Sequence, residues 1–363
     1  MSLSIGIVGL PNVGKSTLFT ALTKKSVAIE NFPFCTIDPS VGLVRVPDNR
    51  LQKLGEFSHS EKVIPTAIEF VDIAGLVEGA AQGEGLGNKF LSHIREVDAI
   101  AHVVRIFDDS NVTHVHGDVD PCRDIEVINL ELIFADLSTV TKRLENVVRD
   151  SRAGKKEAIA EEEVLNKIKQ SLEIGKFAAE TSLPSKEVEI VKQLQLLTFK
   201  PVMYILNKKC DGFNFDEQND PRYEKLLDLL HGKKSVLVDV GIEHELRDTH
   251  VDEKQTLRRE FGVLDNGIDA LIRAGYSLLD LITFFTTGEK ETRAWTVTRG
   301  ATAPEAGAAI HSDFQDKFIR AQTISWDTLL DSGSIAKARE GGLIRAEGKE
   351  YIVRDGDVME FLI

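Results

Sequence analysis

A glycine-rich segment near the start of the chain constrains the fold most. Residues 9–16 read Gly-Leu-Pro-Asn-Val-Gly-Lys-Ser. They follow an apolar stretch, residues 4–10, that predicts a buried strand, and they precede residues 17–23, which predict a helix. Between a strand and a helix, the pattern G-x-x-x-x-G-K-S is typical of a phosphate-binding loop. We therefore expect an α/β fold that binds a nucleoside triphosphate.

The parts of this loop have distinct predicted roles. Its glycines let backbone amides curl around the phosphates, and the helix N-terminus adds a favourable dipole. Lys15 would reach the β- and γ-phosphates, and the Ser16 hydroxyl would bind Mg²⁺. Asn12 is a candidate ligand for K⁺, and the alternative is that it only caps its own turn. The expected nucleotide contacts in the loop are Asn12, Val13, Gly14, Lys15, Ser16 and Thr17.

Two later segments predict the rest of the magnesium site and the switches. The apolar strand 67–72 ends in Asp72, and Gly75 completes a D-x-x-G pattern. Asp72 would hold Mg²⁺ through water, and the Gly75 amide would contact the γ-phosphate. Thr36, in the preceding loop, would close over the metal. Residues 75–87 contain five glycines, a density that predicts a mobile second switch.

The base-reading segment departs from the usual GTPase pattern. After the expected strand 201–206, residues 207–210 read Asn-Lys-Lys-Cys, where GTPases carry N-K-x-D. The thiol of Cys210 cannot accept two hydrogen bonds from guanine, and Asp211 lies one residue late. We expect Asn207 and Lys208 to contact the base. ATP is favoured over GTP, and both stay open.

The catalytic group is not supplied by the usual glutamine. Leu76 follows the D-x-x-G pattern and cannot orient a water molecule. His114 follows the expected strand 99–107 and can orient or deprotonate water near neutral pH. The alternative is a loop histidine satisfied by the backbone. Lys15 and His114 are the candidate catalytic residues.

Composition excludes several classes of protein. Asp and Glu number 58 against 44 Lys and Arg, a net charge of −14, so nothing signals DNA binding, and RNA contact needs a local basic patch. No run of 18 apolar residues that could span a membrane occurs in the sequence. The three cysteines are scattered without a metal-binding spacing, which favours the reducing cytoplasm.

Residues 128–197 predict an antiparallel coiled-coil arm with its turn near 152–156. Apolar residues recur there at spacings of three and four. Residues 142–156 hold six basic and two acidic residues, which is typical either of a solvated face or of an RNA contact. The two seams are Leu130, Ile133, Leu137, Val140, Leu144 and Val147, and then Leu165, Ile168, Leu172, Gly175 and Ala179.

A helical stretch near 257–281 precedes a separate C-terminal unit. Strands are expected at 292–298, 350–353 and 358–363, and a helix at 306–319. These elements predict a small β-grasp module. From residue 281 onward the unit carries 10 basic and 13 acidic residues. Its charge therefore favours recognition of a protein or of a shaped RNA surface over a grip on RNA by itself.

Several segments together resemble the YchF subfamily of Obg-related P-loop proteins, the Obg-like ATPases. The matching stretches are 34–39, 72–79, 83–91, 118–121 and 313–321, and the resemblance covers essentially the whole chain. It implies a Mg²⁺-dependent NTPase that tolerates or prefers ATP and associates with ribosomes in the cytoplasm. It also implies a TGS domain at the C-terminus and a histidine at the position of His114. Two departures are Cys210, where the family carries Glu, and residues 238–241, where it carries a Ser-Ala pair.

These observations predict a P-loop NTPase domain over 1–127 and 200–280, an inserted coiled-coil arm over 128–199, and a TGS-like β-grasp domain over 281–363. The mostly parallel sheet belongs to the first. We expect a ribosome-associated switch that hydrolyses ATP, with ribosomal RNA contacted by the arm tip and the TGS-like domain. Two alternatives stay open: a GTP-specific enzyme in which Asp211 reads guanine, and a nucleotide-sensing regulator with negligible hydrolysis.

Overall fold

The computed structural model describes residues 3–23, 40–73, 88–115, 117–210, 212–249, 251–260 and 267–363. They form two compact units. The first comprises the described residues of 1–24, 38–42 and 70–268, and the second those of 43–69 and 269–363. Residues 43–69, expected in the P-loop domain, thus pack with the C-terminal segment. The finer division into three domains stays a prediction.

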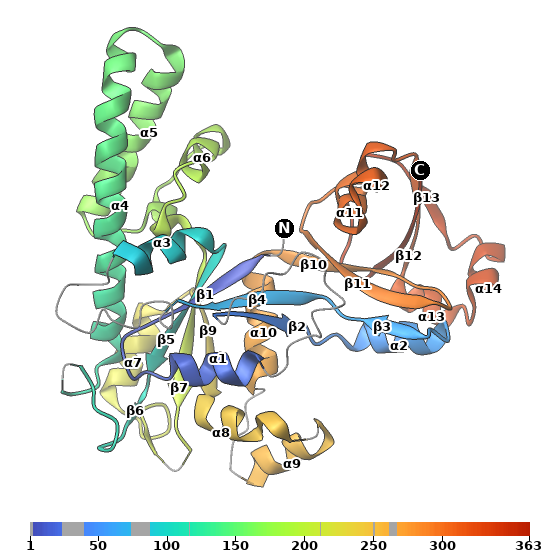
Figure 1. Cartoon of the computed structure of the whole chain (residues 1–363), viewed down its shortest axis with the longest axis horizontal. Coiled ribbons are helices and arrows are strands. Elements are labelled where there is room, and N and C mark those ends of the chain that lie inside the picture. The colour runs from blue at the N-terminus through green and yellow to red at the C-terminus, as the bar shows by residue number, and fades with distance from the viewer. Residues whose placement is uncertain are drawn as a thin grey trace. The chain divides into compact units, whose positions relative to one another are not determined.

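One six-stranded sheet has the order β2-β4-β1-β5-β7-β9, and its strands β1, β5, β7 and β9 belong to the first unit (Figure 1). The pairs β1–β5, β5–β7 and β7–β9 are parallel. Every residue of β5 is buried, as expected for a parallel strand covered on both faces. The predicted α/β fold with a mostly parallel sheet is confirmed. The strands are β1 (Ser4–Val8), β2 (Val41–Arg45), β4 (Ala67–Asp72), β5 (Ala99–Arg105), β7 (Val202–Lys208) and β9 (Lys234–Asp239).

Helices and short elements complete the first unit. The strand predicted over 99–107 ends at Arg105, because Phe107 and Asp108 pair with a different strand, β8. None of the described helices has the length and apolar content needed to cross a membrane. The elements are α1 (Lys15–Thr23), α3 (Asn88–Glu96), β6 (Phe107–Asp108), η3 (Ala178–Glu180), η4 (Leu197–Phe199), β8 (Phe213–Asn214), α7 (Pro221–Leu229), α8 (Val240–Glu245), η5 (Leu246–Asp248) and α9 (Val251–Glu260). From Asp269 onward, the next helix, α10 (Gly267–Leu278), belongs to the second unit.

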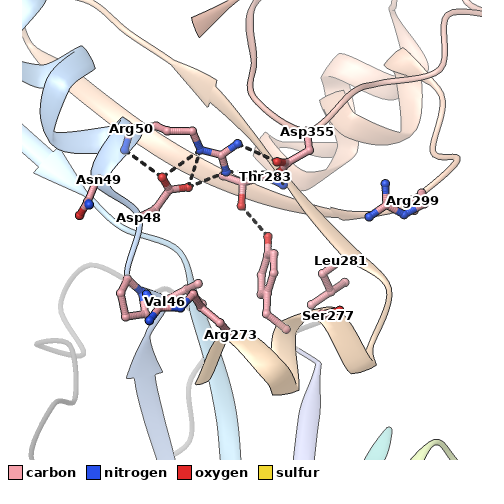
Figure 2. A pocket seen from close by; sticks show the side chains of 12 residues that line it. Val46, Asp48, Asn49, Arg50, Arg273, Ser277, Leu281, Thr283, Arg299 and Asp355 are labelled. Atoms are coloured by element: carbon pink, nitrogen blue, oxygen red, sulfur yellow. Dashed lines mark hydrogen bonds and ion pairs between the residues drawn. The ribbon is translucent and has the colours of Figure 1, made fainter. Parts of the chain in front are cut away.

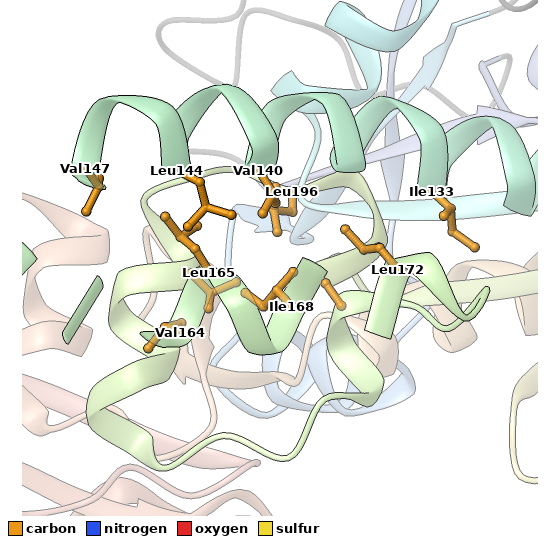
Figure 3. Packing of buried hydrophobic residues seen from close by; sticks show 11 residues of the cluster. Ile133, Val140, Leu144, Val147, Val164, Leu165, Ile168, Leu172 and Leu196 are labelled. Atoms are coloured by element: carbon orange, nitrogen blue, oxygen red, sulfur yellow. The ribbon is translucent and has the colours of Figure 1, made fainter. Parts of the chain in front are cut away.

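The arm consists of α4 (Pro121–Arg152) and α5 (Lys156–Glu173), followed by the short α6 (Ser185–Lys192). The first two helices run side by side in opposite directions (Figure 1). Figure 3 shows their seam, where apolar side chains of one helix meet those of the other. Its buried residues include Ile133, Val140, Leu144 and Val147 from α4, and Val164, Leu165, Ile168 and Leu172 from α5.

The predicted seams are too long at both ends. Leu130 is 47% exposed, because Ile128 and Leu132 occupy the buried face of α4 at that level. Gly175 and Ala179 lie beyond the end of α5. Gly175 has φ +77°, a left-handed conformation that helps to end the helix.

The second unit is built on a mixed sheet with the order β13-β12-β14-β10-β11-β3. Neighbouring residues of β10 face opposite sides, so Phe284 packs with Val297 and Ala306, whereas Phe285 packs with Leu54 of α2. The elements are α2 (Asn49–Phe57), β3 (Lys62–Ile64), β10 (Leu281–Thr286), β11 (Glu291–Thr298), α11 (Ala303–Ile310), α12 (Ser312–Asp316), β12 (Arg320–Ser325), α13 (Trp326–Asp331), α14 (Ile335–Glu340), β13 (Arg345–Glu347) and β14 (Asp357–Leu362).

Three sequence predictions for this unit are wrong in detail. The helix expected over 306–319 is two short helices, because His311 adopts extended backbone between them. The segment 350–353 contributes one isolated bridge, Thr302 to Ile352, rather than a strand. The helical stretch expected to reach residue 281 stops at Leu278, and β10 begins at Leu281. The sheet and α11 are compatible with a β-grasp module.

Candidate nucleotide-binding site

The predicted nucleotide segments meet at one edge of the first sheet. Parallel strands end at the same edge, and ligands bind there in open α/β sheets. Arg105 at the end of β5 pairs in register with Asn207, and Lys208 pairs with Asp239 at the end of β9. The phosphate-binding loop follows β1, whose last residue, Val8, is in register with His102. Residues far apart in the sequence are therefore neighbours here.

Two glycines allow the loop to lie directly against the sheet. Gly9 has φ +148°, and a Cβ atom there would lie 2.5 Å from the Val103 carbonyl oxygen. Gly14 has φ +103°, and its Cβ would lie 2.5 Å from Asn207 Nδ2. A larger residue at either position would push the loop away from β5 or β7, because backbone and a buried amide cannot yield.

Lys15 is buried at the start of α1 and already bound within its own loop. Its Nζ donates a hydrogen bond of 2.7 Å to the Leu10 carbonyl oxygen. Burial lowers the pKa of Lys15 to about 8, although the Asp72 carboxylate acts in the opposite direction. A triphosphate would add negative charge beside this ammonium group.

The described part of the expected magnesium site contains two candidate oxygen ligands. Ser16 is exposed in the first turn of α1, and Asp72 is buried at the end of β4. Mg²⁺ is usually held by one or two protein oxygens together with phosphate and water, so these residues fit the ion. No cluster of three His, Cys, Asp or Glu side chains that could hold a metal occurs among the described residues. Thr36 and Gly75 lie outside the described residues.

Asn207 joins the phosphate-binding loop to the start of α8. Its Nδ2 donates to the Val13 carbonyl oxygen at 2.9 Å, and its Oδ1 accepts from the Val240 amide at 3.2 Å. The side chain is buried. These contacts make Asn207 a scaffold residue of the site, and its contact with the base stays a prediction.

Lys208, which we expect to contact the base, is held by side chains that the sequence analysis did not identify. Lys208 Nζ lies 3.0 Å from Asp216 Oδ2 and 2.5 Å from Glu217 Oε1. Burial lowers the pKa of Lys208, but the hydrogen bonds to these carboxylates outweigh it and raise the pKa overall. Asp239 caps α8 by accepting from the Ile242 amide at 2.9 Å. Cys210 is half-buried, and Asp211 lies outside the described residues.

Asn12 and His114 lie in adjoining loops. Asn12 has φ +62°, and its Nδ2 donates to the Thr113 carbonyl oxygen at 3.1 Å. The next residue, His114, is buried, and its Nε2 lies 2.9 Å from Asp124 Oδ2 at the start of α4. Asp124 was not predicted. The imidazole is thus held by a carboxylate next to the phosphate-binding loop, and its catalytic role stays a prediction.

Two further buried residues at this site were missed from the sequence. His102 of β5 lies behind the loop, where burial and then the charge of Lys15 lower its pKa to about 3. Arg105 of β5 is fully buried and donates to three backbone carbonyls. The available signal was a histidine and an arginine inside an otherwise apolar strand, residues 99–105.

The second unit contains a separate pocket of about 410 Å³. Figure 2 shows Arg50 between Asp48 and Asp355 on its wall. Nη2 lies 2.7 Å from Asp48 Oδ2, and Nη1 lies 2.7 Å from Asp355 Oδ2. Asp355 also accepts from the Thr283 amide at 2.9 Å. These groups satisfy one another, and the network holds α2 to the turn before β14.

Comparison with known proteins identifies the family. The Bacillus subtilis (strain 168) protein "Ribosome-binding ATPase YchF" is 51% identical over 363 residues, covering 99% of each chain. This chain belongs to the YchF family. The YchF protein of Escherichia coli O157:H7 is 48% identical over 100% of this chain and 99% of its own length. The structure titled "Structure of the Schizosaccharomyces pombe YchF GTPase" has a TM-score of 0.89 at 36% identity, covering 99% of this chain and 98% of that one.

Two family models match separate parts of this chain. Residues 4–208 match a model described as "50S ribosome-binding GTPase". Residues 281–363 match the YchF-GTPase C-terminal model, described as "Protein of unknown function (DUF933)". These matches confirm the predicted resemblance, the P-loop fold with a C-terminal YchF domain, and the enzyme class, a P-loop NTPase.

Proposed function

We propose that this YchF-family chain is a Mg²⁺-dependent switch in the cytoplasm that hydrolyses ATP, and less readily GTP, to the diphosphate and phosphate while it engages ribosomes. The observation that carries the proposal is Lys15, buried in a tight glycine loop with its Nζ 2.7 Å from the Leu10 carbonyl oxygen. The proposed link to ribosomes comes from the names of the relatives, because the B. subtilis and E. coli proteins are called ribosome-binding ATPases.

The residues of the phosphate-binding loop and the expected metal ligands would bind the nucleotide and its ions. Lys15 leaves the Leu10 carbonyl for the β- and γ-phosphates, and the amides of residues 13–17 surround them. Ser16, Asp72 and Thr36 would hold Mg²⁺, which neutralises charge on the phosphates when bound. The Gly75 amide would contact the γ-phosphate. K⁺ beside Asn12 is a second candidate ion.

His114 would orient the attacking water. Because an ionised carboxylate only accepts hydrogen bonds, the 2.9 Å contact of His114 Nε2 with Asp124 Oδ2 supports a tautomer with the imidazole proton on Nε2. In this proposal the other ring nitrogen, Nδ1, is the atom that orients the water. A carboxylate that fixes the tautomer in this way is a recurrent device in catalysis.

The preference of the site for adenine or guanine can be tested directly. Cys210 lacks the carboxylate that reads guanine, which favours ATP, whereas the S. pombe relative is titled a GTPase. Calorimetric titration of the Mg²⁺-bound protein with non-hydrolysable ATP and GTP decides between them. Tighter binding of the ATP form supports the proposal, and tighter binding of the GTP form supports base reading by Asp211.

A nucleotide-sensing regulator with negligible hydrolysis is the second candidate. It is favoured by the burial of His114 in its pair with Asp124, because that side chain must reach water to act. Turnover measured with and without ribosomes separates the candidates. Phosphate release in either condition supports the enzyme, and none in both supports the regulator.

The arm tip is our candidate for the ribosomal RNA contact, together with the TGS-like domain. Arg143 is engaged by Glu161 and Lys155 by Asp150. The remaining basic residues of the patch are exposed and available for phosphates: Lys142, Arg149, Arg152 and Lys156. Changing Arg149 and Arg152 to Gln should reduce the amount of this protein that sediments with ribosomes, and should make that binding less dependent on salt concentration. The matched change of Lys169 and Lys176, away from the tip, should not.

A further inference from the structure

Arg105, a buried cationic residue, is the last residue of β5 and lies at the edge of the sheet that carries the candidate nucleotide site. Arg105 is 1% exposed and follows six buried residues of the strand. Moving a guanidinium group out of water costs several kcal/mol unless its donors are satisfied. The position therefore requires partners for the whole planar group.

Those partners are three backbone carbonyls of one loop. Nε donates to the Phe107 oxygen at 2.9 Å, Nη2 to the Asp109 oxygen at 3.1 Å, and Nη1 to the Val112 oxygen at 3.0 Å. The guanidinium carbon also lies 4.6 Å from the centre of the Phe107 ring. Burial lowers the pKa of Arg105, and the nearby carboxylates of Asp108, Asp109 and Asp124 oppose that effect.

The same loop carries the residues that meet the phosphate-binding loop. Directly after Val112, the Thr113 oxygen accepts from Asn12 Nδ2 at 3.1 Å. His114 comes next and is held by Asp124. Fixing three carbonyls between Phe107 and Val112 therefore sets where Thr113 and His114 lie.

We propose that Arg105 is a positioning residue that holds residues 107–114 against the phosphate-binding loop and so supports turnover; this rests on the proposed function of the site. Lysine cannot replace it, because its ammonium is a compact point charge, whereas the guanidinium presents several donors in a fixed plane. Arginine is needed here for its shape as well as its charge.

The test compares Arg105→Lys with Arg95→Lys in the full-length chain. Arg95 is a matched control: it donates to Thr139 Oγ1 at 2.9 Å and to the Gln195 oxygen at 3.3 Å, but it precedes the start of β5 rather than following its end. In Arg105→Lys, amide hydrogen exchange over residues 106–115 should rise about tenfold. The turnover number should fall about tenfold, while affinity for non-hydrolysable ATP stays within about threefold. Arg95→Lys should change none of these.

Each outcome decides the proposal. Unchanged exchange over 106–115, or faster exchange with unchanged turnover, overturns it. If amide exchange also becomes faster across β5 and β7, the proposal is overturned, because Arg105 would then only stabilise the core of the sheet. If the wild-type chain shows no turnover, the proposed function fails, and the exchange data still test the positioning. If Arg105→Lys does not fold, Arg105→Gln is used, and failure of both contradicts the proposal.

Discussion

His114 Nε2 lies 2.9 Å from Asp124 Oδ2, and both side chains are buried. Asp124 belongs to the first turn of α4, the long helix of the arm. The same helix that builds the arm therefore also holds the histidine beside the phosphate-binding loop. This pair gives the nucleotide site a direct contact with the base of the arm.

Replacing His114 with Ala should slow turnover about 100-fold, because water loses its orienting group. Asp124→Asn should have a smaller effect, about tenfold, because an amide can still contact the ring but no longer fixes its tautomer. Affinity for non-hydrolysable ATP should stay within about threefold. Single-turnover kinetics and calorimetry measure both. Asp150→Asn is the control, since Asp150 is an exposed partner of Lys155 at the arm tip; full activity of His114→Ala would remove the catalytic role.

Nucleotide binding should take up protons in mildly alkaline solution. Lys15 has its pKa lowered to about 8 by burial, so about half of the free protein carries it neutral at pH 8. The triphosphate favours the charged form and raises this pKa again. Binding at pH 8 should therefore take up about 0.5 proton, and at pH 7 about 0.1. Calorimetry in buffers of different ionisation enthalpy measures the uptake, and equal values at both pH values would contradict the prediction.

His102 should make the first unit sensitive to acid. Its pKa is about 3 in the folded chain, against an ordinary value of 6.5. Between these values the unfolded chain binds a proton that the folded chain does not, so this contribution to stability is present above 6.5 and is lost as the pH falls. In this range, the contribution of His102 to the free energy of unfolding falls by up to about 1.4 kcal/mol for each pH unit.

His102→Gln should flatten that pH dependence. The measurement is the opening free energy of β5 by native-state hydrogen exchange between pH 6.5 and 4.5, compared with His231→Gln at an exposed position. The same slope in His102→Gln and in the wild type would show that another group carries the acid sensitivity.

Truncation of the arm seam should cost more stability than truncation outside it. Ile168 is fully buried between α5 and α4, so Ile168→Ala should lower the arm's unfolding free energy by about 2–5 kcal/mol. Leu130 is 47% exposed, so Leu130→Ala should change it by less than about 0.5 kcal/mol. Hydrogen exchange of α5 tests both, and similar losses would place Leu130 in the seam after all.

The sequence alone determined the parts of this protein that depend on local pattern. Glycine spacing between a strand and a helix predicted the phosphate-binding loop, because only such a loop lets the backbone approach phosphates. Runs of apolar residues predicted the parallel strands, and spacings of three and four predicted the arm. These patterns also carried the resemblance to the YchF family.

The tertiary structure decided which distant residues meet. The register of neighbouring strands and the position where α4 begins decide three of these contacts. Asn207 donates to the Val13 carbonyl, Asp124 contacts His114, and Arg105 donates to three backbone carbonyls. None of these pairings leaves a periodic signal in the chain. The packing of residues 43–69 with the C-terminal segment is decided in the same way, because a sheet face accepts any apolar helix that fits it.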